Sequence, residues 1–148
     1  MKDIRALFLD VQEHLEQYIQ WQIDHKPSLD VDAFAREVST AEDVFRVSLL
    51  LYPRFIEVEG AVVLAEHYEE ENWKAWREKL EVFETARMVN HVHVEDFLCR
   101  DYQGCTNTCD SLGSLLAHFW QLAVNDQFPK AGVVVEYDGD VINISQIE

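Results

Sequence analysis

The sequence is poor in residues that break or cross-link a chain, with 5 Gly, 3 Pro and 3 Cys in 148 positions. So few glycines and prolines argue against long flexible linkers. The odd cysteine count, and an N-terminus without an uncharged apolar stretch, argue against a secreted disulfide framework. We therefore expect one domain over residues 1–148, cytoplasmic, with reduced thiols.

Long apolar runs and basic residues are also scarce. No apolar run approaches the roughly 20 residues that cross a bilayer. Lys and Arg number 12 against 28 Asp and Glu, which gives a formal net charge of −16. Such a field repels phosphates and anionic lipid and attracts cationic proteins. We expect a basic protein partner, no direct nucleic acid binding and no membrane, although the charge also fits a role in solubility alone.

Catalytic signatures are missing as well. The chain has no Gly-rich phosphate loop, no Gly-x-Ser-x-Gly elbow and no His-Glu-x-x-His. Close carboxylate pairs such as Glu42-Asp43 follow from the acidic composition, and neither member lies on an apolar stretch that would raise its pKa. The sequence predicts a protein that is not an enzyme and needs no cofactor.

Apolar residues are plentiful, at 48% of the chain, so a hydrophobic core is expected. Apolar residues at steps of three and four predict helices over 3–24, 41–52, 69–83 and 112–124, with a shorter one near 31–35. Ser39 and Glu42 have the spacing of a capping box, and Pro53 predicts that the second of these helices ends near Tyr52. Residues 92–98 are interpreted as one or two helical turns.

Two segments predict β-hairpins. Residues 55–64 are rich in β-branched side chains around Glu59-Gly60, and residues 133–144 flank Asp138-Gly139. We expect the two hairpins to pair in one antiparallel sheet of about four strands. The predicted fold class is α+β, with helices packed on one face of that small sheet.

The segment from 91 to 109 holds the residue types that bind metals. Its candidate ligands are His91, His93, Cys99, Cys105 and Cys109. The cysteine spacing lacks the Cys-x-x-Cys pair that makes a zinc prediction strong. The competing interpretation makes the histidines part of a helix end and the thiols small buried hydrophobes.

For partner binding, the candidates are carboxylates on predicted exposed faces and one tryptophan outside the main apolar stripe of its helix. They are Asp10, Glu13, Trp21, Asp24, Glu57 and Glu59. An exposed tryptophan near carboxylates is typical of an interface anchor, whereas burial under a neighbouring loop would make it structural.

These features favour a small acidic binding protein that neutralises a basic partner. In size and charge the chain resembles bacterial immunity proteins and phage-encoded inhibitors, a likeness of class that involves no particular residues. It implies an inhibitor of a toxin, a nuclease or a nucleic-acid-handling complex. Two alternatives stay open: a metal-binding protein that uses the segment from His91 to Cys109, and a non-catalytic structural or adaptor subunit.

Overall fold

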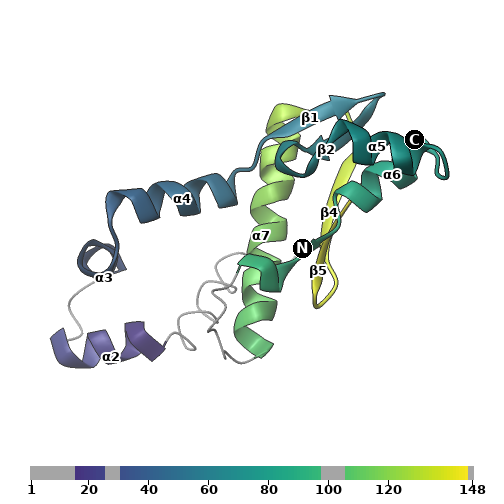
Figure 1. Ribbon diagram of the computed structural model, residues 1–148. Coiled ribbons are helices and arrows are strands. Elements are labelled where there is room, and N and C mark those ends of the chain that lie inside the picture. The colour runs from purple at the N-terminus through teal and green to yellow at the C-terminus, as the bar shows by residue number, and fades with distance from the viewer. Residues whose placement is uncertain (1–15, 26–30, 98–105, 147–148) are drawn as a thin grey trace.

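The computed structural model describes residues 16–25, 31–97 and 106–146 (Figure 1). The helices are α2 (Glu16–His25), α3 (Val31–Val38), α4 (Ala41–Leu51), α5 (Glu70–Arg77), α6 (Val82–Val89) and α7 (Thr106–Gln127). Short 3-10 helices are η1 (Ala65–His67) and η2 (Val94–Phe97). The strands are β1 (Phe55–Val58), β2 (Ala61–Leu64), β3 (Val92–His93), β4 (Val133–Tyr137) and β5 (Val141–Gln146).

The predicted α+β class is confirmed, and both predicted hairpins form. The hairpins do not join in one ladder, however. β1 pairs with β2 in a two-stranded sheet, and the second sheet has the order β3-β5-β4, all antiparallel. The additional strand β3 comes from the segment that was expected to be helical.

The turn of the first hairpin lies at Glu59-Gly60, as predicted. Both residues have positive φ, 53° and 87°, as a type I′ turn requires. Glycine adopts this conformation freely, whereas Glu59 does so at a steric cost. Its carboxylate accepts bonds from Trp73 Nε1 at 3.1 Å and Arg77 Nε at 3.0 Å, which fix the turn against α5.

All four residues of strand β2 are buried, because the strand lies between two hydrophobic cores. Successive side chains of a strand point to opposite faces. Val62 and Leu64 join the core that β3, β4, β5 and α7 build, while Ala61 and Val63 join a second core with α5 and α6. The first hairpin is therefore sandwiched between α7 with its sheet and the α5–α6 pair.

Two side-chain amides occupy the outer edge of β2, where a further strand would otherwise pair. Buried Asn90 accepts from Leu64 N and donates to Val62 O, both at 2.9 Å. Gln146 accepts from Val62 N at 2.9 Å and donates to Gly60 O at 3.3 Å. These bonds satisfy backbone groups that would be costly to bury alone, and they explain why the hairpins stay in separate sheets.

The outer edge of β4 is bonded in the same way by a helix. Gln121 on α7 donates to Val133 O at 3.0 Å and accepts from Val135 N at 2.8 Å. Edge strands expose a template for further strand pairing unless it is covered. The glutamine thus fixes α7 to the sheet and covers part of this edge.

The predicted helix over 69–83 is two helices. α5 ends at Arg77, whose guanidinium donates to Leu80 O, and α6 begins after Glu81. Glu81 and Glu84 form a reciprocal capping box that opens the new helix. The sequence pattern spans the break because Trp73 and Phe83 both face the second core.

Helix α7 is longer than the predicted helix over 112–124 and begins at Thr106. Gly113 lets it approach β4, since a Cβ atom there would lie 2.3 Å from the Tyr137 ring. In the described part of the chain, no helix combines the length and apolarity of a bilayer-crossing segment.

Helix α4 ends at Leu51, as Pro53 predicted, and its capping box lies one residue later than expected. Thr40 accepts from Asp43 N at 3.1 Å, and Asp43 accepts from Thr40 N at 3.0 Å. Figure 1 shows α2, α3 and α4 extending to one side of α7. We call residues 16–25 and 31–51 the arm, and residues 53–97 and 106–146 the body.

Candidate functional site

Helix α4 exposes its apolar side chains to solvent. Every residue from Ala41 to Leu49 is exposed, and none in the helix is fully buried. The exposed fractions of Val44, Phe45, Val47 and Leu49 are 54%, 64%, 52% and 57%. The helix itself was predicted from the sequence, whereas the exposure of these side chains is a finding of the structure.

The apolar side chains form two rows along the helix. One row consists of Val44 and Val47. The other consists of Phe45, Leu49 and Tyr52, at steps of four and three residues. We call these five side chains the α4 face. An isolated helix of 11 residues is marginal in water, and most helices gain their stability from packing an apolar side. The α4 face is thus a surface that a partner would stabilise by covering it.

The body holds α4 by its last turn. Leu50 and Leu51 pack on the core, and Trp120 Nε1 donates to Leu50 O at 2.8 Å. The Tyr52 hydroxyl donates to the Asp126 carboxylate, and this bond raises the pKa of Tyr52. The base of the helix is therefore fixed while its first nine residues project.

A cavity of about 350 Å³ opens at this base. Leu49 and Tyr52 of the α4 face line it, together with Trp120 from α7 and Phe97 from η2. The Phe97 and Trp120 rings meet edge to face, with centroids 5.9 Å apart. The α4 face and the cavity are accordingly continuous.

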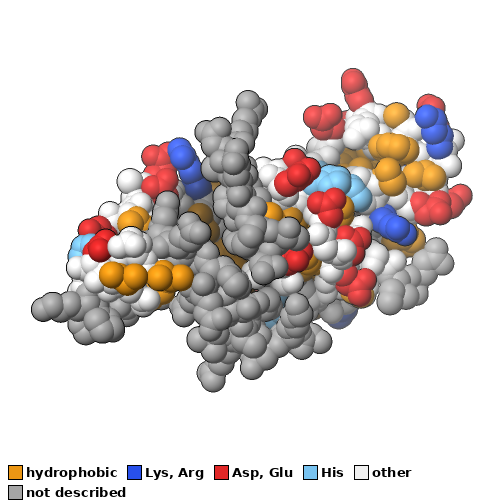
Figure 2. Space-filling view, turned by 90° about the horizontal axis from the view of Figure 1, so that it is seen from below, with side chains coloured by type: hydrophobic (Ala, Val, Ile, Leu, Met, Phe, Trp, Pro, Cys, Tyr) orange, Lys and Arg blue, Asp and Glu red, His pale blue; other side chains and the backbone are white. Residues whose placement is uncertain are grey.

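The arm is acidic, and the first turn of α4 carries Glu42 and Asp43. Residues 16–51 contain seven Asp and Glu against three Lys and Arg. Arg46 is bonded to Glu42 within the helix, and Thr40 holds the pKa of Asp43 below its usual value through its hydroxyl and backbone N–H. In Figure 2, which shows the molecule from below, red acids lie at both ends of the described surface.

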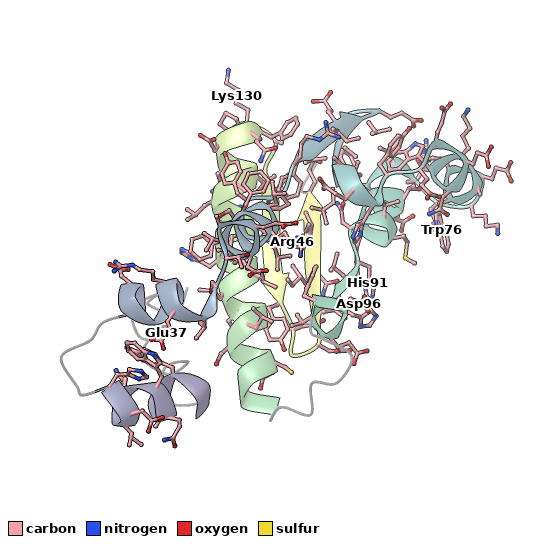
Figure 3. The ribbon with its side chains drawn as sticks, turned by 60° about the vertical axis from the view of Figure 1, so that its left-hand side comes forward. Glu37, Arg46, Trp76, His91, Asp96 and Lys130 are labelled. Atoms are coloured by element: carbon pink, nitrogen blue, oxygen red, sulfur yellow. The ribbon has the colours of Figure 1, made fainter. Side chains whose placement is uncertain are left out.

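The arm candidates from the sequence have different environments. Asp24 is exposed and accepts from Gln20 at 2.9 Å. Trp21, considered as an exposed anchor, is only 7% exposed, and its indole N–H donates to Glu37 at 2.7 Å. Figure 3 shows Glu37 between α2 and α3, which explains why Trp21 is a packing residue. Asp10 and Glu13 lie outside the described residues.

The candidates on the first hairpin are far from equivalent. Glu57 is exposed on β1. Glu59 is committed to Trp73 and Arg77, whose bonds lower its pKa. The structure brings neither onto α4, so the surface it presents differs from the predicted set of carboxylates.

Acidic residues also gather where η2 meets the turn between β4 and β5. Residues 91–97 and 133–146 contain no Lys or Arg. Val94 N donates to Asp140 O at 3.0 Å. Acids are numerous in this chain, so this cluster alone does not define a binding surface.

The described metal candidates do not form a centre. The His91 and His93 rings lie 4.9 Å apart, and His93 Nδ1 is 3.3 Å from an Asp140 oxygen without hydrogen-bond geometry. Cys109 is a half-buried free thiol on α7, while Cys99 and Cys105 lie outside the described residues. Over residues 16–25, 31–97 and 106–146, no three His, Cys, Asp or Glu side chains are placed to hold an ion.

Sequence reasoning missed the α4 face because its residues look like a core. Valine, phenylalanine and leucine at helical spacing predict burial wherever they occur. One available signal was the breadth of the pattern, since apolar residues occupy more than half of the helix circumference from Val44 to Leu51. A helix that is apolar over most of its surface needs cover on more than one side.

Comparison with known proteins gives no family: no family model, no curated protein and no solved structure matches this chain.

Proposed function

We propose that this chain is a small acidic cytoplasmic protein that binds a basic protein partner through the α4 face and neutralises it. The observation that carries the proposal is the exposure of Val44, Phe45, Val47 and Leu49, each more than half exposed on one projecting helix. An exposed apolar surface of this kind supports a role in binding another protein.

The shape of the α4 face favours a helical segment of the partner. Two apolar rows along a helix leave a groove between them, and ridges of a second helix pack into such grooves. Recognition of this kind uses apolar anchors at i, i+3, i+4 and i+7. The partner segment would thus be an amphipathic helix.

Charge favours a basic partner over a second copy of this chain. Two copies would each bring a net charge of −16, and their acidic arm residues would face one another. A basic helix instead meets complementary potential, which accelerates association and suppresses wrong partners. Occupation of the partner's basic surface would then block its access to nucleic acid or other anionic targets.

Binding of defined peptides tests the proposal. Three helical peptides of about 18 residues share one apolar pattern and carry Lys and Arg, Gln, or Glu at the flanking positions. We expect the basic peptide to bind at least about tenfold more tightly than the acidic one at low salt. The difference should shrink at 1 M salt, where the Debye length is about 3 Å.

Variants of the α4 face provide the control. Combined Val44→Ser, Phe45→Ser and Val47→Ser should abolish binding of the basic peptide. Leu122→Ser and Met88→Ser, at exposed apolar positions of the body, should leave it unchanged. Equal affinity for all three peptides, or no binding, contradicts the proposal. Dimers that the triple variant dissociates in light scattering would identify a second copy as the occupant instead.

A further inference from the structure

We infer that the cavity at the base of α4 receives one bulky apolar side chain of the bound helix; this rests on the function proposed above. The cavity of about 350 Å³ lies where α4, the segment between α4 and β1, η1, η2 and α7 meet. Its walls include Leu49, Tyr52, Leu64, Phe97 and Trp120.

Size and lining favour an apolar occupant. An apolar cavity of about 150 Å³ is already large enough for benzene, so this cavity has room for an indole or phenyl ring. Trp120 and Leu64 are each 2% exposed and form its inner wall, with the Phe97 ring perpendicular to Trp120. A charged side chain would lose its hydration there without a buried counter-charge.

The cavity is held open by bonds across its walls. Trp120 donates to Leu50 O at 2.8 Å and joins α7 to α4. Gln127 donates to Pro53 O at 2.9 Å and accepts from Phe55 N at 2.8 Å, which fixes the chain between α4 and β1. A site fixed before binding costs less ordering entropy when it is filled.

Continuity with the α4 face identifies the occupant as part of the partner. Leu49 and Tyr52 belong both to the exposed row that starts at Phe45 and to the cavity lining. A helix that lies along this row meets the cavity at its end. One end of the partner segment therefore inserts a side chain, as buried anchors do at interfaces.

The arm then sets the spacing of the partner's anchor and charges. The lining contains one exposed cation and one exposed anion, Arg54 and Glu66, so it has no excess of acidic charge. The acidic end of α4, at Glu42 and Asp43, lies nine or ten residues before Tyr52, or about 14 Å at 1.5 Å per residue. The expected ligand is a helix with a large apolar residue about nine positions from its basic residues.

A double-mutant cycle tests the insertion. The basic peptide carries Trp or Ala at the anchor position, and each form is titrated against the native chain and against Phe97→Ala. We expect the Trp-to-Ala change to weaken binding about 30-fold with the native chain, as at a hot spot, and under about threefold with Phe97→Ala. The same cycle with Met88→Ala should show no coupling.

Free indole provides a test that needs no variant. Indole added to the native chain should shift the Trp120 indole N–H resonance, and the Trp peptide should compete for it. The insertion is overturned if the Trp-to-Ala change weakens binding equally for the native chain and for Phe97→Ala, and indole does not shift the Trp120 resonance. If Phe45→Ser still abolishes peptide binding in that case, the α4 face remains the binding surface. A shift with indole that no peptide reproduces would assign the cavity to a small molecule and also overturn the insertion.

Discussion

The arm and the body use the same apolar residue types in opposite ways. In the body, Leu116 and Ile142 are fully buried between α7 and the sheets. In the arm, Leu49 and Phe45 on α4 are more than half exposed. Residue type alone therefore does not separate a core from an interface; what separates them is whether another element of the chain covers the helix.

Polar bonding differs between the regions too. In the body, side-chain amides bond backbone groups, as buried Asn90 does on β2 and half-buried Gln121 does on β4. Helix α4 is supported by exposed bonds within itself, at Thr40–Asp43 and Glu42–Arg46. An exposed ion pair such as Glu42–Arg46 contributes little and a helix cap contributes about 1 kcal/mol, whereas a buried bond is costlier to break. We expect the body to set the global stability and α4 to open locally.

The difference between the arm and the body is tested most directly by replacing one leucine in each region with alanine. Leu116→Ala should lower the free energy of unfolding by about 2–5 kcal/mol, because it leaves a cavity in the core. Leu49→Ala should change it by less than about 0.5 kcal/mol, since the side chain is exposed in both states. Urea unfolding followed by circular dichroism measures both. Equal losses would show that α4 is packed in solution as part of the core.

A second test compares a side-chain amide of the body with one of the arm. Asn90→Ala should cost about 2–3 kcal/mol, because Val62 O and Leu64 N lose their buried partner. Gln20→Ala removes an exposed amide of the arm that donates to the exposed Asp24, so we expect no measurable loss. The measurement is again urea unfolding. A loss with Gln20→Ala as large as with Asn90→Ala would contradict the division into arm and body.

These partners show where sequence reasoning reaches its limit. The hairpin turns were predictable, because Glu59-Gly60 and Asp138-Gly139 are local signals. The bonds of Asn90 and Gln146 to β2 were not, because they join residues 26 to 86 positions apart and any amide could have made them. The helix break at Glu81 was hidden by an apolar pattern that continues across it.

For the candidate site, the sequence predicted the acidic character and missed the surface. Net charge follows from composition, whereas the position of each carboxylate follows from packing. Glu59 illustrates this, since its carboxylate is bound to Trp73 and Arg77 and stabilises a turn. The breadth of the apolar pattern on α4 indicated that the helix needs cover on more than one side, but not that the fold would leave two of its rows exposed.

The smallest effect separates local from global stability within one helix. Thr40→Ala removes the hydroxyl that caps α4, which is worth about 1 kcal/mol to a helix. Hydrogen exchange of the α4 amides should accelerate about fivefold, because local opening governs exchange there, while the amides of α7 keep their protection. The Asp43 pKa, held below its usual value mainly by the Thr40 hydroxyl, should rise toward that value in the variant. The lowered pKa of Asp43 stabilises the folded helix at any pH above the pKa of Asp43 in the unfolded chain. This stabilisation is lost as the pH falls through the pKa of Asp43 in the folded chain. Native α4 should therefore fray at acidic pH, and the variant should fray less steeply. Loss of protection in α7 of the same size would show instead that the arm and the body unfold together.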